Sequence, residues 1–248
     1  MNKNVSLLAV SYIFGFTAAT ITVFLSGIIG SQIASIKSLA TLPTALTVVG
    51  TAVFAAFAAK IMSKIGRKLG FILASLASSI TCLLAAYAIY DRNFTLFCIA
   101  NLILGACMAF THQYRFAAAE SVEKDKAPKA ISIIMLSGIV AAFLGISSAN
   151  YTKDLFTDFQ YVGSYITLAI FMFMPTIFFL FYENKNISEI EISKNHTGRS
   201  YFEIIFQPRF LQAVIAAAFA YAIMSFLMTA TPMSMHLMEK MSLEKTGL

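Results

Sequence analysis

The chain has 248 residues, of which 58% are hydrophobic and only 12% are charged. Its mean hydropathy of +0.77 excludes an ordinary soluble globular domain and indicates a membrane protein. The net charge of +6 comes from cations that flank apolar stretches, so it indicates membrane topology rather than a nucleic-acid partner.

Seven stretches lack Asp, Glu, Lys and Arg and are long enough to cross a bilayer. At about 1.5 Å per residue, roughly 20 residues cover a hydrocarbon core of about 30 Å. Inside lipid a helix satisfies its own backbone, so the sequence predicts an all-α, polytopic bundle of transmembrane helices. The predicted spans are Val5–Gly30, Leu39–Ala59, Leu69–Tyr90, Phe94–Tyr114, Ala130–Asn150, Tyr161–Tyr182 and Phe210–Met233.

The loops between these spans predict the orientation of the chain. Taken alternately, they place 13 Lys and Arg residues on one side of the membrane and 5 on the other. The richer side, which includes Lys3, is expected to be cytoplasmic. The N-terminus is therefore predicted to lie in the cytoplasm, and the expected location is the bacterial inner membrane.

Several uncharged polar side chains in the first, second and fourth spans could face a central cavity. Thr and Tyr also serve packing in membrane helices, so that alternative stays open. These candidates are Tyr12, Thr17, Thr20, Thr44, Thr47 and Asn101.

The loop after the second span, KIMSKIGRK from Lys60 to Lys68, packs four basic residues and one glycine into a short connection. A helix that ends there leaves carbonyls unpaired and a partial negative charge, which cations favour. Gly66 permits a tight turn that a Cβ would resist. The loop could also serve only to fix the topology.

The end of the fourth span carries three ionisable side chains. His112 titrates in a range that would suit proton coupling, or it is a hydrogen-bonded structural group. Arg115 is expected to extend to the interface, or to contact a gate or an anionic solute. Glu120 lies on the same side of the membrane as Arg67.

Small residues line one face of the fifth span, at Gly138, Ala142 and Gly145. A similar face on the second span consists of Ala52, Ala55, Ala56 and Ala59. Small faces let helices approach closely, so these two are predicted to meet. Pro175 is predicted to kink the sixth span.

The stretch AKIMSKIGRK resembles the signature loop of the major facilitator superfamily, G-x-x-x-D-[RK]-x-G-[RK]-[RK], between its second and third helices. The positions that match are Lys64, Gly66, Arg67 and Lys68, and those that depart are Ala59 and Ser63. In that family the loop latches a cytoplasmic gate through its acidic residue. Ser63 cannot carry this charge, and Glu120 could supply it instead.

The resemblance extends over nearly the whole chain, through ATLPTALTVVGTAV from Ala40, QYRFAAAE from Gln113, AISIIMLSGIVAAFLG from Ala130 and TATPMSM from Thr229. It implies a transporter that moves a small solute by alternating access, with no enzymatic activity and no cofactor or metal. In the family's fourth helix an arginine often stands four residues before a glycine. Asn101 takes that place here, before Gly105.

The resemblance also implies how the chain is divided. Residues 1–182 would form a six-helix half, 183–209 a cytoplasmic linker, 210–233 a seventh helix and 234–248 an extracytoplasmic tail. Five helices of the family would then be missing, so the chain is expected to be truncated.

Two alternatives to a working transporter stay open. The chain could be a non-transporting fragment, or a split half that needs a second chain to supply the missing helices. A seven-helix receptor fits the number of spans, although a cytoplasmic N-terminus argues against it. The expected partners are membrane lipid and a small solute, and no nucleic acid.

Overall fold

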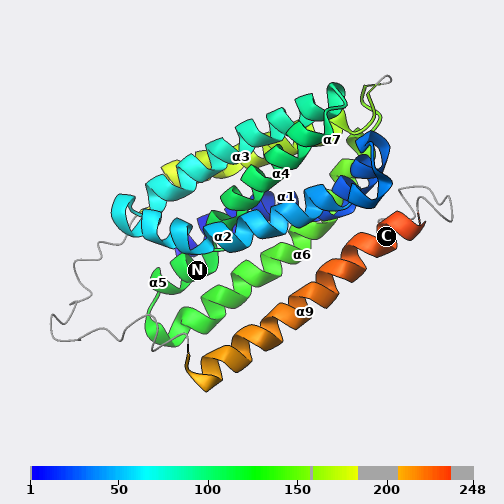
Figure 1. Ribbon diagram of the computed structural model, residues 1–248. Helices are drawn as coiled ribbons and strands as arrows, with labels where there is room; N and C mark the ends of the chain where they lie inside the picture. The colour runs from blue at the N-terminus through cyan, green and yellow to red at the C-terminus, as the bar shows by residue number, and fades with distance from the viewer. Residues whose placement is uncertain (1, 157–158, 184–205, 236–248) are drawn as a thin grey trace.

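The computed structural model describes residues 2–156, 159–183 and 206–235. Within these ranges it contains seven helical stretches that are long and apolar enough to cross a membrane (Figure 1). Each corresponds to one predicted span, and the expected all-α bundle is therefore confirmed.

The helices follow one another with short connections. Their bounds are α1 (Lys3–Ile33), η1 (Lys37–Leu39), α2 (Leu42–Ile65), α3 (Arg67–Tyr90), α4 (Phe94–Thr111), α5 (Tyr114–Glu120), η2 (Lys124–Lys126), α6 (Ala127–Thr152), α7 (Val162–Leu180) and α9 (Pro208–Met233). α7 continues through Pro175, which lies inside it.

Helix α1 lies at the centre of the bundle and contacts α2, α4, α6 and α7. Most of its residues between Asn4 and Gly30 are buried. Its sequence distributes Leu, Ile and Phe together with Gly, Ser and Thr around all sides, without a charged face. A helix that is apolar all round is typical of an interior position, and its small residues let neighbours approach.

The other helices pack in pairs around α1. The most extensive contacts join α2 to α4, α3 to α7, and α1 to α6. The most apolar stretches of α2 and α6 are only 22% and 28% buried, compared with 61% for α1. The described residues therefore leave a broad apolar side of the bundle uncovered along these two helices.

The fourth membrane-spanning stretch, Phe94–Glu120, extends beyond the predicted end at Tyr114 and consists of two helices, because α4 ends at Thr111 and α5 begins at Tyr114. The backbone N–H of Gln113 donates to the carbonyl oxygen of Phe110, three residues back, at 3.0 Å. This tighter turn, with no change of backbone region at His112, joins the two helices without reversing the chain.

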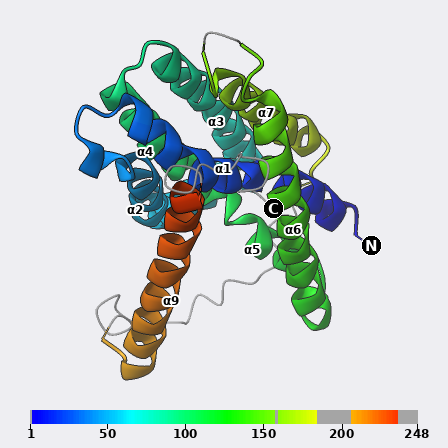
Figure 2. The ribbon, with the colours of Figure 1, turned by 90° about the vertical axis from the view of Figure 1, so that its right-hand side faces the viewer.

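Helix α9 stands apart from the six preceding spans. Its main contact is with α1, where Thr229 and Met233 face Gly27. From there it diverges from α6 and α2 toward its own N-terminus, as Figure 2 shows. Nearly all of its side chains are exposed, and Thr229 is its one buried residue among those described. The predicted linker and C-terminal tail fall almost entirely outside the described residues.

One end of the bundle, here called the N-terminal end, gathers the start of α1, the α2–α3 turn, the α5–α6 connection and the end of α7. The side-chain amide of Asn2 donates to the carbonyl oxygen of Ser121. Lys3 Nζ lies 2.9 Å from Glu183 Oε1, and this hydrogen bond and charge lower the pKa of Glu183. These connections share one end because successive spans run in opposite directions.

Candidate functional site

The α2–α3 turn is a single residue. α2 ends at Ile65, α3 begins at Arg67, and Gly66 between them has φ 84° and ψ 157°. L side chains resist this conformation, which explains glycine at that point of the basic loop. The turn fixes Arg67 and Lys68 at the first residues of α3.

Arg67 forms a bidentate ion pair with Glu120 of α5. Nε lies 2.6 Å from Oε2, and Nη2 lies 2.5 Å from Oε1. The Arg67 side chain is 22% exposed, and that of Glu120 is 53% exposed. A bidentate pair of this kind fixes orientation as well as adding energy, so it ties the start of α3 to the end of α5.

Lys68 and Ser63 make different contacts from Arg67. Lys68 Nζ donates to the carbonyl oxygen of Leu180, the last residue of α7, at 2.7 Å. A cation suits this position because a helix C-terminus carries unpaired carbonyls. Ser63 donates to the carbonyl of Lys60 within its own helix at 2.8 Å, and Lys64 is exposed. The basic loop thus joins α3 to α5 and α7, without Ser63.

The candidate cavity residue Asn101 is fully buried and lies at a junction of four helices. Its amide oxygen lies 3.3 Å from the hydroxyls of Ser26 on α1 and Thr47 on α2. Its amide nitrogen donates to the carbonyl of Phe97 at 2.8 Å. The Ser26 hydroxyl also lies 2.9 Å from that of Tyr165 on α7. Asn101 therefore connects helices inside the bundle.

Other candidate cavity residues are also buried between helices. Thr17 and Thr20 donate to carbonyls within α1, at 2.6 and 3.0 Å. Thr44 is buried, and its hydroxyl has no hydrogen-bond partner among the described residues. Thr47 packs against Gly105, where an added Cβ would lie only 2.1 Å from the Thr47 carbonyl oxygen. Of these threonines, Thr47 and Thr20 lie at close contacts between helices, Thr47 at Gly105 and Thr20 at Gly145.

Helices α2 and α4 approach closely at a second point, Gly50, beside the contact of Thr47 with Gly105. Neither close approach was predicted from the sequence. A Cβ on Gly50 would lie 2.3 Å from the carbonyl oxygen of Leu102. The Thr51 hydroxyl donates to the carbonyl of Gly105 at 3.0 Å. The signal was present as small residues at positions 47, 50 and 51, all within about one helical turn.

Aromatic rings of α1 cluster at the junction of α4 and α5. The Phe16 ring stacks on that of Tyr12 with centroids 5.0 Å apart, and it meets His112 edge-on at 6.2 Å. Tyr12 meets Tyr114 edge-on at 6.2 Å. Phe16 and His112 are partly exposed, so this ring cluster has an accessible side.

Arg115 lies one residue beyond Tyr114 and is exposed. Its guanidinium carbon sits 4.9 Å from the centroid of the neighbouring Phe116 ring. Among the described residues it forms no ion pair with an acidic side chain. It lies near the ring cluster in sequence, in the part of the fourth span that leads to the N-terminal end of the bundle.

The small residues of α6 face α1 rather than α2. A Cβ on Gly138 would lie 3.4 Å from the Tyr12 ring, and one on Gly145 would touch the Thr20 hydroxyl. Ala142 is partly buried on the same helix, and the alanine face of α2 is exposed. The prediction that the two small faces meet was therefore wrong, because central α1 takes the closest approach to α6.

Comparison with known proteins adds three findings. The model of the family described as Major Facilitator Superfamily matches residues 6–247. The chain is 31% identical over 235 residues to the riboflavin transporter RfnT of Brucella anthropi, a match that covers 94% of this chain and 58% of that protein. The chain thus spans a little over half the length of this relative. No solved structure gives a significant match.

Proposed function

The chain belongs to the major facilitator superfamily and, with seven apolar spans in the part that the structure describes, is an integral membrane protein; from this premise we propose that it forms part of a transporter for a small solute. The observation that carries the proposal is the family match over residues 6–247. In such transporters one helical bundle rocks against another around a site near the middle of the membrane.

The packing of the first six spans supports this role. The second to sixth spans pack around α1, held by close glycine crossings and by the hydrogen bonds of Asn101. The uncovered sides of α2 and α6 suit contact with a second bundle. We propose that the second bundle comes from further helices, in the same chain or in a companion chain, because the relative is longer than the matched stretch.

The ion pair of Arg67 and Glu120 is proposed to act in the gate at the N-terminal end. Glu120 supplies an acidic partner for the basic loop, which Ser63 cannot do. Because the pair joins α3 to α5, it would hold the end of the fourth span in place while the bundle moves. The 13 to 5 distribution of cations supports a cytoplasmic location for this end, in a bacterial inner membrane.

The solute is proposed to be a flat aromatic molecule of the riboflavin type. The named relative transports riboflavin, and the ring cluster of Tyr12, Phe16 and His112 offers aromatic surface. Phe16 lies 11 residues, or about three turns, before Gly27 on the same face of α1. Gly27 contacts α9, and from this contact α9 diverges from the bundle toward its own N-terminus (Figure 2). Flat rings can stack there.

Riboflavin binding to the full chain in detergent or nanodiscs tests the solute, through the change in riboflavin fluorescence. We expect saturable binding that Phe16→Ala weakens by about fivefold or more, because a stacked ring pair is worth roughly 1 kcal/mol beyond its buried area. Phe54→Ala is the matched control, since Phe54 lies on the exposed side of α2. Absence of saturable binding, or equal losses in both variants, would overturn the riboflavin assignment.

Uptake of labelled riboflavin into proteoliposomes tests transport itself. Uptake above that of empty vesicles supports a working transporter. Binding without uptake would mean that the chain contributes a solute surface but needs the second bundle to move the solute.

A further inference from the structure

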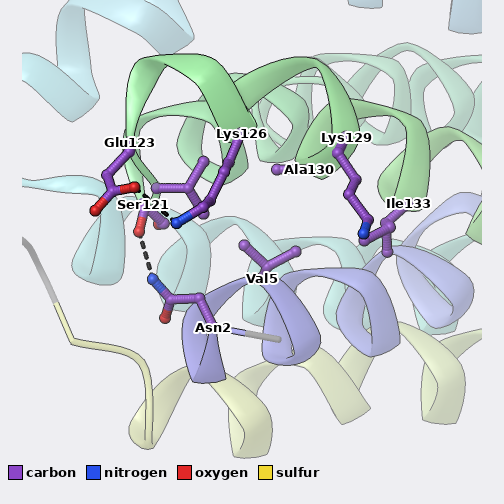
Figure 3. Close-up of a pocket in the computed structure, with 9 residues that line it drawn as sticks. Asn2, Val5, Ser121, Glu123, Lys126, Lys129, Ala130 and Ile133 are labelled. Atoms are coloured by element: carbon purple, nitrogen blue, oxygen red, sulfur yellow. Dashed lines mark hydrogen bonds and ion pairs between the residues drawn. The ribbon is translucent and has the colours of Figure 1, made fainter.

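A pocket of about 600 Å³ opens at the N-terminal end of the bundle between α1, the end of α5 and the start of α6 (Figure 3). Asn2 and Val5 line it from α1, and residues between Ser121 and Ile133 line it from the opposite side. None of the residues of the ring cluster or of the Arg67–Glu120 pair belongs to it. It is therefore separate from the solute surface and the gate.

Two lysines and one glutamate set the charge of this pocket. Lys126 Nζ lies 2.7 Å from Glu123 Oε2, so these two charges largely offset each other. Lys129 has no ion-pair partner within the residues that the structure describes, and Figure 3 shows its amino group extended toward Ile133. The first turn of α6, which begins at Ala127, adds the partial positive charge of a helix N-terminus. The pocket therefore favours an anion.

The ends of membrane-spanning helices lie near the lipid headgroups, and the position of the pocket follows from this. It sits at the ends of two membrane-spanning stretches that begin at Lys3 and Lys124. Its apolar lining includes Val5, Ala130 and Ile133. An anion that binds here thus meets the lysines of α6 next to the apolar side chains of Val5, Ala130 and Ile133.

An apolar stripe continues from Lys129 along α6 into the membrane. Ile133, Leu136, Val140 and Phe143 follow it at spacings of 4, 3, 4 and 3, which keeps them on one helix face. Leu136, Val140 and Phe143 are 61%, 51% and 69% exposed. The stripe is about 21 Å long at a rise of 1.5 Å per residue. This order, a cation followed by a long apolar surface, complements a phosphate attached to an acyl chain.

We propose that this pocket binds the phosphate of an anionic phospholipid, with Lys129 and Lys126 on the phosphate and an acyl chain along the α6 stripe. Free phosphate and a phospholipid headgroup both present a phosphate anion, and the apolar stripe of α6 favours the phospholipid. Glu123 competes with the phosphate for Lys126 and so limits the affinity. Basic pockets between transmembrane helices are suited to such headgroups.

Native mass spectrometry of the purified full chain tests the proposal, with phosphatidylglycerol and the zwitterionic phosphatidylcholine as the added lipids. We expect phosphatidylglycerol to be retained preferentially. Lys129→Gln should weaken this retention by about fivefold, the effect of one lysine near an anionic surface. Glu123→Gln should strengthen it, because it frees Lys126. The matched control is Lys124→Gln, which removes the same charge from the same turn outside the pocket.

Equal losses in Lys129→Gln and Lys124→Gln would overturn the proposal, because they would indicate attraction to general surface charge. Unchanged binding in Lys129→Gln would overturn it too. The side chains of Glu123, Lys124 and Lys129 are exposed, so the melting temperature of each variant in detergent should stay unchanged. A change in lipid retention then does not come from a loss of folding. Adding inorganic phosphate as a competitor distinguishes a phospholipid site from a site for free phosphate. Retention of phosphatidylglycerol in its presence supports a phospholipid site, and displacement of the lipid by phosphate overturns the contribution of the acyl chain.

Discussion

Arg67 on α3 and Glu120 on α5, 53 positions apart, form a two-pronged ion pair in which Nε and Nη2 lie 2.6 and 2.5 Å from the two carboxylate oxygens. The pair lies at the N-terminal end, half open to solvent. In the proposed gate, Glu120 supplies from another span the acidic partner that the basic loop lacks at Ser63.

Exchanging the two charges tests this pair. Arg67→Glu and Glu120→Arg each place like charges together and should each lower the free energy of unfolding by about 1 kcal/mol, since partly exposed pairs contribute at most that much. The double exchange should recover most of the loss. Thermal unfolding in detergent measures all three variants.

The conclusion rests on the coupling energy, which is the change in the free energy of unfolding of the double variant minus the sum of the changes in the two single variants. A glutamate at the first residue of α3 also gains from the helix dipole, which would mask part of the cost of Arg67→Glu. A double variant whose loss equals the sum of the two single losses would show that the residues do not interact.

The close crossing of α2 and α4 predicts an intolerant glycine. A Cβ at Gly105 would lie 2.1 Å from the carbonyl oxygen of Thr47, and backbone cannot move aside as a flexible side chain can. Gly105→Ala should therefore lower the free energy of unfolding by roughly 1–3 kcal/mol. Gly138→Ala is the control, because its Cβ would meet the Tyr12 ring at 3.4 Å. Similar melting temperatures for both variants would contradict the structure.

The hydrogen bonds of Asn101 predict a cost for removing its amide. Asn101→Leu should destabilise the bundle by about 0.5–2 kcal/mol, the range found for polar contacts between membrane helices. Asn150→Leu is a matched control, because the amide oxygen of Asn150 is buried without a hydrogen-bond partner. If both changes have the same effect on the melting temperature, the contacts with Ser26 and Thr47 contribute no net stability.

Cysteine labelling tests the proposed orientation. In intact cells, a membrane-impermeant maleimide should react with Lys37→Cys and should reach Lys64→Cys only after the membrane is opened. Background should be low because Cys82, Cys98 and Cys107 are buried. Reaction of Lys64→Cys in intact cells would reverse the assignment and place the Arg67–Glu120 pair outside the cytoplasm.

The sequence by itself determined the seven spans and the basic turn. Both follow from local chemistry, since about 20 apolar residues must form a helix in lipid, and Gly66 with its neighbouring cations specifies a tight turn at a helix end. The break near His112 was not visible, because no Gly or Pro marks it and the backbone stays in the helical region.

Only the tertiary structure decided which of these residues meet. Asn101 and Thr47, candidates for a cavity or for packing, meet at a junction of helices, and the small face of α6 packs on α1 instead of α2. The rotation of each helix about its axis decides such contacts. In helices that are apolar on every side, no local pattern fixes that rotation, which comes from the combined packing of all neighbours.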